Sequence, residues 1–370
     1  MSEQFRNFWK FEQSQHAELR YQMAGNLILI PTLEPTVAET CIDSLTKSMH
    51  RASAIAIVVY NSNKEDVDSY ISPSVIRVGR NDSELLAEEF AKKAGCSKEF
   101  LFGEQWYGRS YGGASNLLLA LGCAFKAKRM AKVDDDCVDK SKEWSYNAFN
   151  TEENNQLIYF GNYDGSPTNC LHLLHPEVAK ELSKFIYSQK EIGERLNPLH
   201  FHGTVTKNGN LVFSENAAKT SCYPVLFDKT TKIHARGEIY FWQEKLVEDG
   251  FSFVYKENLV LGHFPKEKKI MDWLYSIALG FDLSFVNRIK TSQNRMPTYP
   301  ERENAIAEFQ YWLRKVDLPR ESDISILESA LANSVRFTDE KFSEYSNSQR
   351  AWKQLMQADL TNLVNKVLNS

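Results

Sequence analysis

The feature that most constrains the fold of this chain is the alternation of short apolar runs with segments of helical periodicity. Asn26–Pro31 and Ala54–Tyr60 are apolar runs that end at a proline or a polar turn, and both are predicted to be buried strands. Thr36–Met49 and Ser83–Ala94 are predicted helices, the second with Ser83 as its N-cap. Strands that alternate with helices form βαβ units. We therefore expect an α/β fold with a mostly parallel sheet flanked by helices, and ligands at the carboxyl ends of its strands.

Three consecutive aspartates, Asp134–Asp136, follow the short apolar run that begins at Met130. A buried carboxylate without a partner costs several kcal/mol, so a positive group is expected beside them. Carboxylates spaced one apart at the end of a strand suit a hard divalent cation, Mg²⁺ or Mn²⁺. A cation that held a diphosphate would make this stretch the centre of a nucleotide-sugar enzyme. The alternative is a helix N-cap and a solvated turn.

A glycine-rich loop that opens a helix is predicted within Trp106–Arg129. Its glycines, Gly108, Gly112 and Gly113, would let the backbone approach a ligand closely. Arg109 is a candidate contact to phosphate. The alternative is an ordinary turn, with Arg109 as a surface residue.

The second informative stretch is Ala235–Phe264. Its periodicity predicts an amphipathic helix over Gly237–Asp249 with Glu238 in the first turn. Further along, Leu259–Leu261 is a predicted short strand, and His263 directly follows it. Glu238 has a simpler explanation, since an acid in the first turn favours the helix dipole. His263 has one as well, because a buried histidine is often only hydrogen-bonded.

Other residues that can bind metals give weaker patterns. His200 and His202 would share one face of a strand, which is metal-ligand spacing, but such a pair also hydrogen-bonds or lines a surface. The cysteines show no C-x-x-C pair and no zinc spacing, so reduced thiols are expected. They are Cys41, Cys96, Cys123, Cys137, Cys170 and Cys222.

Composition narrows the class of protein. The chain has 44 basic and 48 acidic residues and a net charge of −4, so no broad cationic surface for nucleic acid is expected. The N-terminus lacks the apolar core of a signal peptide, and no segment approaches the roughly 18 apolar residues of a membrane span. These observations predict a cytoplasmic protein without a transmembrane segment.

Three parts are expected along the chain. Residues 1–24 are predicted to dock as a helix, with a peripheral membrane contact as the alternative. Residues 25–264 are expected to form the α/β domain. Residues 265–370 are rich in helix formers, with a break at Arg295–Glu301, and predict a helical extension. That extension would shape an acceptor site, mediate contact with a partner or a second copy, or only cover the main domain.

The order of these motifs resembles the GT-A fold of nucleotide-sugar-dependent glycosyltransferases, of the D-x-D type and similar to glycosyltransferase family 2. The resemblance rests on the strand that ends at Pro31, the strand that ends at Asn61, the glycine loop with Asn116 on the next helix, and D-D-D, G-E-x-x-F-W and G-H-F in that order. It spans roughly residues 25–264.

The resemblance implies roles for particular residues. Asp134 and Asp136 would hold a Mn²⁺ or Mg²⁺ that binds the donor diphosphate, His263 would complete the metal shell, and Asp135 would lie nearer the ribose or the sugar. Glu238 would be the catalytic base of an inverting enzyme or would position a sugar in a retaining one. The remaining donor-binding candidates are Pro31, Thr32 and Asn61 at the base and ribose, Arg109 and Arg236 at the diphosphate, and Asn116.

The implied function is metal-dependent transfer of a sugar from a nucleotide-diphosphate sugar, with a UDP-sugar as the expected donor, to a saccharide or another hydroxyl acceptor. The stereochemical outcome is open. One alternative is a non-catalytic module with the same fold that binds a cation or a partner. The other is a nucleotidyltransferase, although the G-x-G-T-R-L loop typical of that class is missing after Ile30.

Overall fold

The structure of the 370-residue chain is a computed structural model. It describes residues 25–32, 34–60, 70–71, 74–103, 111–152, 154–165, 174–186, 210–228, 233–235, 238–264, 270–316 and 321–368. The helix predicted over residues 1–24 lies outside the described residues, as do His200, His202 and Cys170.

The main sheet has nine strands within the described ranges, in the order β3-β4-β2-β1-β5-β8-β7-β11-β6. Strand β1 pairs in parallel with β2 and β5, and β7 pairs in parallel with β11, whereas β8 runs antiparallel between β5 and β7. The expected α/β fold with a mostly parallel sheet is therefore confirmed. The strands are β1 Asn26–Thr32, β2 Ala54–Tyr60, β3 Tyr70–Ile71, β4 Val75–Val78, β5 Arg129–Lys132, β6 Cys137–Val138, β7 Leu157–Gly165, β8 Leu211–Ser214 and β11 Ser252–His263, with β9 Phe227–Asp228 and β10 Ile233–His234 in a separate pair.

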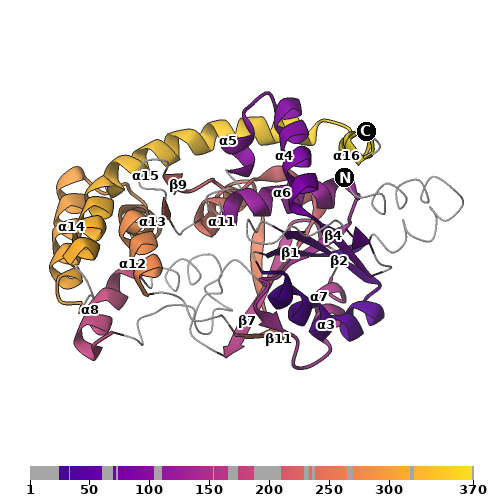
Figure 1. Cartoon of the computed structure of the whole chain (residues 1–370), viewed down its shortest axis with the longest axis horizontal. Helices are drawn as coiled ribbons and strands as arrows, with labels where there is room; N and C mark the ends of the chain where they lie inside the picture. Colours follow the sequence, from indigo (N-terminus) through magenta and orange to yellow (C-terminus); the bar gives the residue numbers. More distant parts are fainter. Residues whose placement is uncertain are drawn as a thin grey trace, which may run out of the picture.

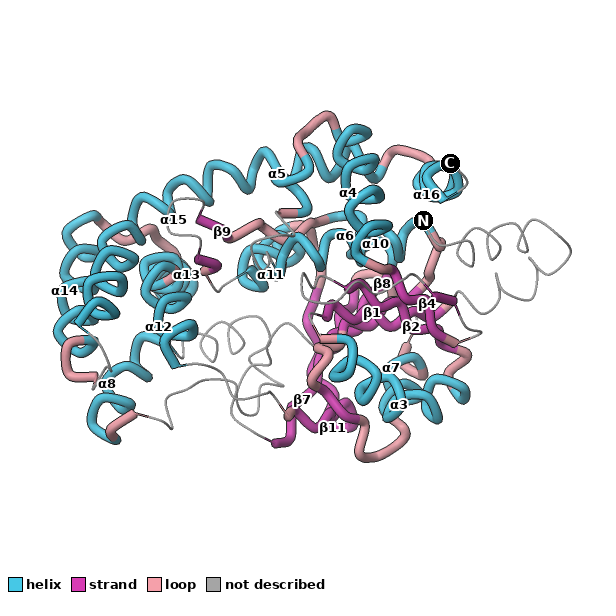
Figure 2. The backbone as a smooth tube through the Cα atoms, viewed as in Figure 1, coloured by secondary structure: helices cyan, strands magenta, loops and turns pink. Residues whose placement is uncertain are grey.

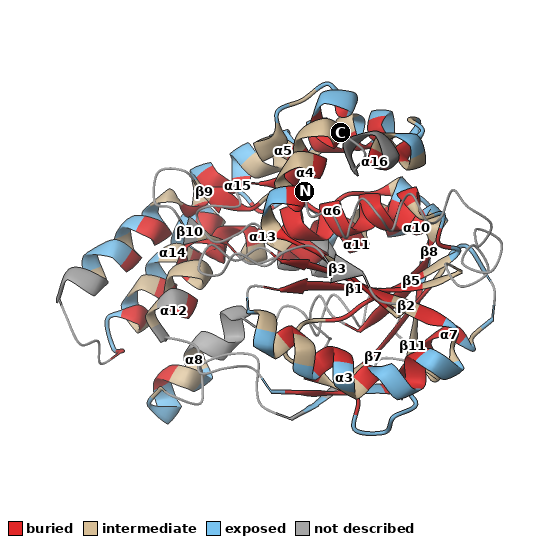
Figure 3. Ribbon diagram, turned by 45° about the vertical axis from the view of Figure 1, so that its right-hand side comes forward, coloured by how far each residue is buried: buried red, intermediate tan, exposed pale blue. Residues whose placement is uncertain are grey.

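Helices cover both faces of this sheet, as Figure 1 shows. On one face lie α3 (Pro35–Arg51) and α7 (Trp144–Phe149), and on the other lie the helices around α6 (Tyr111–Ala124). Strand side chains alternate between the two faces, so Ile28 and Ile30 pack with α3 while Leu27 and Leu29 pack with α6. Figure 3 shows that buried residues dominate the strands and α6. The other helices on the α6 face are α4 Arg80–Ala94, α5 Lys98–Phe102, α10 Glu215–Thr220 and α11 Glu238–Glu248.

Two local predictions need correction. Helix α4 begins after Gly79, so Ser83 lies inside its first turn, where its hydroxyl donates to the Arg80 carbonyl at 2.8 Å, and it is not the N-cap. Strand β11 is continuous through a register shift between Tyr255 and Val260, so His263 is the last residue of a strand and does not follow one.

Residues 265–370 are largely helical where the structure describes them, as predicted. Helices α12 to α14, with α8 (Pro176–Ile186) beside them, form a core of their own, and α15 then runs back across the molecule (Figure 2). Trp352 and Leu355 at the end of α15 and Val364 on α16 belong to the core on the α6 face of the sheet. None of the helices in the described ranges combines the length and apolar character that crossing a membrane requires. The extension consists of α12 Ile270–Leu279, α13 Phe281–Gln293, α14 Tyr299–Leu313, α15 Glu321–Met356 and α16 Leu360–Leu368.

Candidate active site

The aspartate triplet forms the turn between β5 and the edge strand β6. After β5 ends, the Val133 amide still donates to the Leu29 carbonyl at 3.0 Å, and the turn closes with the Cys137 amide on the Asp134 carbonyl at 3.2 Å. The triplet therefore lies at the carboxyl ends of β1 and β5, which is the edge where ligands bind in folds of this class.

Each aspartate of the triplet contacts a different element. The Tyr111 hydroxyl at the start of α6 donates to Asp134 Oδ1, and the Thr32 hydroxyl at the end of β1 donates to Asp135 Oδ2 at 2.6 Å. His263 Nε2 at the end of β11 lies 3.3 Å from Asp136 Oδ1. The structure thus brings together the triplet, Thr32 and His263, all of them singled out in the sequence.

The contact between Asp136 and His263 follows from strand pairing. Strand β6 pairs antiparallel with β11, so that Cys137 is opposite His263 and Val138 is opposite Gly262. The Phe264 amide also donates to the Asp136 carbonyl at 3.0 Å. A side chain at position 262 would displace the exposed Phe264 ring, because an added Cβ would lie 2.7 Å from Phe264 Cε2.

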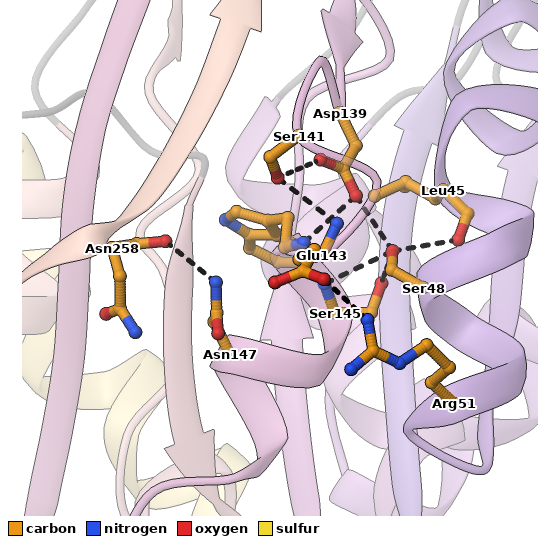
Figure 4. A network of polar contacts seen from close by, with 10 residues as sticks. Leu45, Ser48, Arg51, Asp139, Ser141, Glu143, Ser145, Asn147 and Asn258 are labelled. Atoms are coloured by element: carbon orange, nitrogen blue, oxygen red, sulfur yellow. Dashed lines mark hydrogen bonds and ion pairs between the residues drawn. The ribbon is translucent and has the colours of Figure 1, made fainter.

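Asp139 anchors the far end of this turn and was not singled out in the sequence. Asp139 is only 2% exposed, and its carboxylate accepts from the Ser48 hydroxyl at 2.8 Å and the Ser141 hydroxyl at 2.7 Å (Figure 4). It also accepts from the Trp144 amide at 3.0 Å. These bonds tie the acidic turn to α3 and to the first turn of α7. No helix was predicted at Trp144–Phe149, so nothing in the sequence marked Asp139 as the acceptor for the first amide of that helix.

Asn116, predicted to contact the donor, uses its side chain inside the core. Its amide group donates to the Leu101 carbonyl at 2.7 Å and the Tyr223 carbonyl at 2.9 Å, and its oxygen accepts from the Tyr223 amide at 2.7 Å. The residue has no exposed surface. Asn116 therefore holds the backbone of Tyr223, whose ring stacks on Trp242 with the centroids 5.0 Å apart.

The glycines that open α6 approach the protein itself. Gly112 and Gly113 lie in the first turn of the helix, where an added Cβ would come within 2.0 Å of the Pro224 carbonyl oxygen and the Phe102 carbonyl oxygen, respectively. The expectation that these two glycines admit a ligand is corrected: they allow α6 to pack directly against neighbouring backbone. Gly108 and Arg109 lie outside the described residues, as do Asn61 and Arg236.

Lys132, the last residue of β5, is an unexpected member of the site. It is 1% exposed, and its ammonium lies 3.8 Å from the centre of the Tyr111 ring and 4.8 Å from that of Tyr223. Within the described ranges no hydrogen-bond acceptor meets it. Burial lowers the pKa of Lys132 to about 7, against the opposing effect of the Asp134 and Glu238 carboxylates.

Glu238 occupies the same buried region. It is 5% exposed, lies at the start of α11, and acts electrostatically on Lys132 and on Tyr223. Burial, followed by the charge of Asp134, raises the pKa of Tyr111 well above its ordinary value, which keeps its hydroxyl protonated and able to donate. The Asp134 and Glu238 carboxylates are therefore close enough to Lys132, Tyr111 and Tyr223 to act on them electrostatically.

A divalent cation would find a partial ligand set here. No group of three or more His, Cys, Asp and Glu side chains suited to a metal occurs in the described part of the chain. Asp136 and His263 do offer one oxygen and one nitrogen side by side. Cations that bind phosphate substrates commonly use one or two protein carboxylates and complete their shell with phosphate oxygens and water. The residues present fit that arrangement.

A cavity of about 450 Å³ lies at the opposite end of β5, and its walls argue against it as the reaction site. Its lining includes Arg129, Glu152 and Ser214. The Arg129 guanidinium donates to the carbonyls of Ala148, Phe149 and Thr151, so it supports the fold. The amino ends of parallel strands are also the edge where such sheets rarely bind substrates.

Comparison with known proteins shows only a distant likeness. No family model and no curated protein matches the sequence. A mannosyltransferase from Pyrobaculum calidifontis, solved with GDP-Man and Mn²⁺, is 12% identical with a TM-score of 0.38, over 99% of this chain and 98% of that one. TarS from S. aureus is 10% identical with a TM-score of 0.38, over 93% of this chain and 90% of that one. The complex of TarS with UDP-GlcNAc is 10% identical with a TM-score of 0.37, over 87% of this chain and 91% of that one. A likeness at this level does not show which family the chain belongs to.

Proposed function

We propose that this protein is a glycosyltransferase of GT-A type that moves a sugar from a nucleotide-diphosphate sugar to a hydroxyl acceptor. One observation carries the proposal: three consecutive carboxylates lie at the carboxyl ends of β1 and β5, and Asp136 Oδ1 lies 3.3 Å from His263 Nε2. Such a set of acids suits a diphosphate that arrives with a divalent cation. A UDP-sugar is the proposed donor.

Asp136 and His263 would hold Mn²⁺ or Mg²⁺. When bound, the cation stabilises the negative charge that develops on the leaving diphosphate. The protein's own part is to orient the donor. Asp135, fixed by the Thr32 hydroxyl at 2.6 Å, is placed for the ribose or the sugar, and Tyr111 fixes the direction of Asp134. Asp139 holds the turn that carries all three aspartates.

Glu238 is the candidate for proton transfer. In an inverting reaction a carboxylate takes the proton of the acceptor hydroxyl on the face opposite the leaving group. Glu238 is a buried acid outside the triplet that acts, like Asp134, on the charge of Lys132. In a retaining reaction no such base is needed, and Glu238 would position a sugar. Replacing Glu238 with Gln would separate the two, because only the inverting enzyme loses its base.

Calorimetry with a panel of nucleoside diphosphates, with and without Mn²⁺, tests the proposal directly. The wild-type protein is expected to bind at least one of them in a way that requires Mn²⁺, and the Asp134→Ala/Asp136→Ala double variant is expected to lose that binding. Asp43→Ala, an exposed acid on α3, is the matched control and should bind normally. Binding of none of the diphosphates, or binding indifferent to both Mn²⁺ and the double variant, would overturn the proposal.

A further inference from the structure

The buried amine of Lys132 has no role in the chemistry described above. Its chain neighbours, Ala131 and Val133, pack on the α3 face of the sheet, so the lysine side chain enters the opposite face, where α6 packs. There it is almost completely buried and is met by two aromatic rings in place of hydrogen-bond acceptors.

A cation in this position is unfavourable for folding alone. Burying an ammonium group without hydrogen bonds costs free energy, and a methionine of similar length would fill the same space without that cost. Contact with ring faces recovers part of the cost, because the π-electrons attract a cation. What remains to balance the charge is the pair of acids that act on it, Asp134 and Glu238.

The surroundings of the amine are built to keep it in place. Tyr111 offers its ring to Lys132 and its hydroxyl to Asp134, so one side chain fixes both charges. Tyr223 is held at its backbone by Asn116 and at its ring by Trp242. The Tyr223 hydroxyl is buried and has no hydrogen-bond partner among the described residues, so Tyr223 meets the amine through its ring and not through its oxygen.

We propose that Lys132 is a built-in cation of the acidic site: its charge attracts the Asp134 and Glu238 carboxylates before substrate binds and weakens the binding of a free divalent cation. Repulsion between the ammonium and a nearby divalent cation opposes metal binding to the empty site. A diphosphate brings negative charge of its own and removes this penalty, so the cation enters together with the diphosphate. Lys132 acts through the acids and is a positioning residue.

Lys132→Met tests this inference by metal binding, which does not depend on catalysis. Mn²⁺ affinity is measured by calorimetry without nucleotide, with wild type and all variants in the same buffer. The variant is expected to bind free Mn²⁺ roughly tenfold more tightly than wild type. Its melting temperature should be unchanged or higher. Lys132→Arg, which keeps the charge, should retain the weak wild-type affinity, and Lys47→Met, an exposed lysine on α3, should change neither quantity.

The outcomes distinguish this inference from the proposed function. Unchanged Mn²⁺ affinity in folded Lys132→Met overturns it, as does equal tightening in Lys47→Met. Should Lys132→Met fail to fold, Lys132→Gln removes the same charge and is measured in its place, and failure of both to fold would show a structural role and overturn the inference. Only the part concerning the diphosphate rests on the proposed function. A protein that binds no nucleoside diphosphate, yet gains Mn²⁺ affinity on losing the lysine charge, would refute the function and support the built-in cation.

Discussion

Two buried cations show how differently the helical extension and the acidic site treat charge. Arg302 on α14 is 4% exposed, and its guanidinium bonds to both oxygens of Asp282 on α13 and to Asp339 on α15. Lys132 is equally buried, yet it meets two ring faces and no hydrogen-bond acceptor in the described ranges. A buried cation such as Arg302, whose N–H groups are hydrogen-bonded, stabilises the fold. A buried cation such as Lys132, which has no hydrogen-bond acceptor among the described residues but is influenced by two acids, points to a role in binding.

The largest loss of stability is expected when Arg302, the buried cation with hydrogen-bonded carboxylate partners, is replaced. Arg302→Met leaves Asp282, which has no exposed surface, without its partner, and should lower the free energy of unfolding by about 3–5 kcal/mol. Urea denaturation measures the change. Arg336→Met, from an exposed pair with Glu340 on α15, is the control and should leave stability unchanged. If Arg302→Met loses no more unfolding free energy than Arg336→Met, the proposed difference between a cation that stabilises the fold and Lys132 is contradicted.

The anchor of the acidic turn should show the next largest effect. Asp139→Ala removes the acceptor of three hydrogen bonds and leaves the buried Trp144 amide unpaired, which should cost about 1–3 kcal/mol. Because the same residue fixes the turn, Mn²⁺-dependent binding of nucleoside diphosphate should weaken as well. Asp164→Ala, a 66% exposed acid on β7, is the control. Normal binding by a destabilised Asp139→Ala would show that the anchor serves the fold alone.

Two tyrosines differ in the same way, since one hydroxyl is hydrogen-bonded and the other has no partner in the described ranges, and their effects on stability should be smaller. The Tyr345 hydroxyl donates to the Cys222 carbonyl at 3.0 Å, so Tyr345→Phe should lose about 1 kcal/mol of stability. The Tyr223 hydroxyl is buried without a partner in the described ranges, so Tyr223→Phe should lose nothing or gain slightly. Thermal unfolding of the two variants, run side by side, measures the difference. A greater loss for Tyr223→Phe would mean that its hydroxyl is satisfied in solution.

The smallest effect on stability is expected at a partly exposed ion pair between Arg77 on β4 and Glu39 on α3. Hydrogen bonds from Arg77 hold the pKa of Glu39 below its ordinary value of 4.5. A lowered carboxyl pKa stabilises the fold above the unfolded value and loses that contribution as the pH falls through the folded value. Solvent screening limits it to less than about 1 kcal/mol. Urea denaturation between pH 7 and pH 3 should therefore show that the free energy of unfolding falls slightly more steeply with decreasing pH for wild type than for Glu39→Gln. The same pH dependence in both proteins would contradict a stabilising ion pair.

Much of the fold could be read from local patterns. Strand β2 coincides with the predicted run Ala54–Tyr60, and the helix predicted over Gly237–Asp249 differs from α11 by one residue at each end. Strand β8 was not among the strands predicted from the sequence, although it lies between β5 and β7. Its four residues are too few to show a period, and its partners are more than 45 residues away in the chain.

The sequence by itself determined that alternating strands and helices would form an α/β sheet, that three aspartates would follow one of its strands, and that the chain would end in helices. Only the tertiary structure decided which atoms meet at those aspartates. The register of β6 on β11 sets His263 against Asp136, and the packing of α6 over β5 encloses Lys132 between Tyr111 and Tyr223. Local periodicity reports which face of an element is buried, but contacts between distant segments depend on pairing and packing that no short stretch encodes.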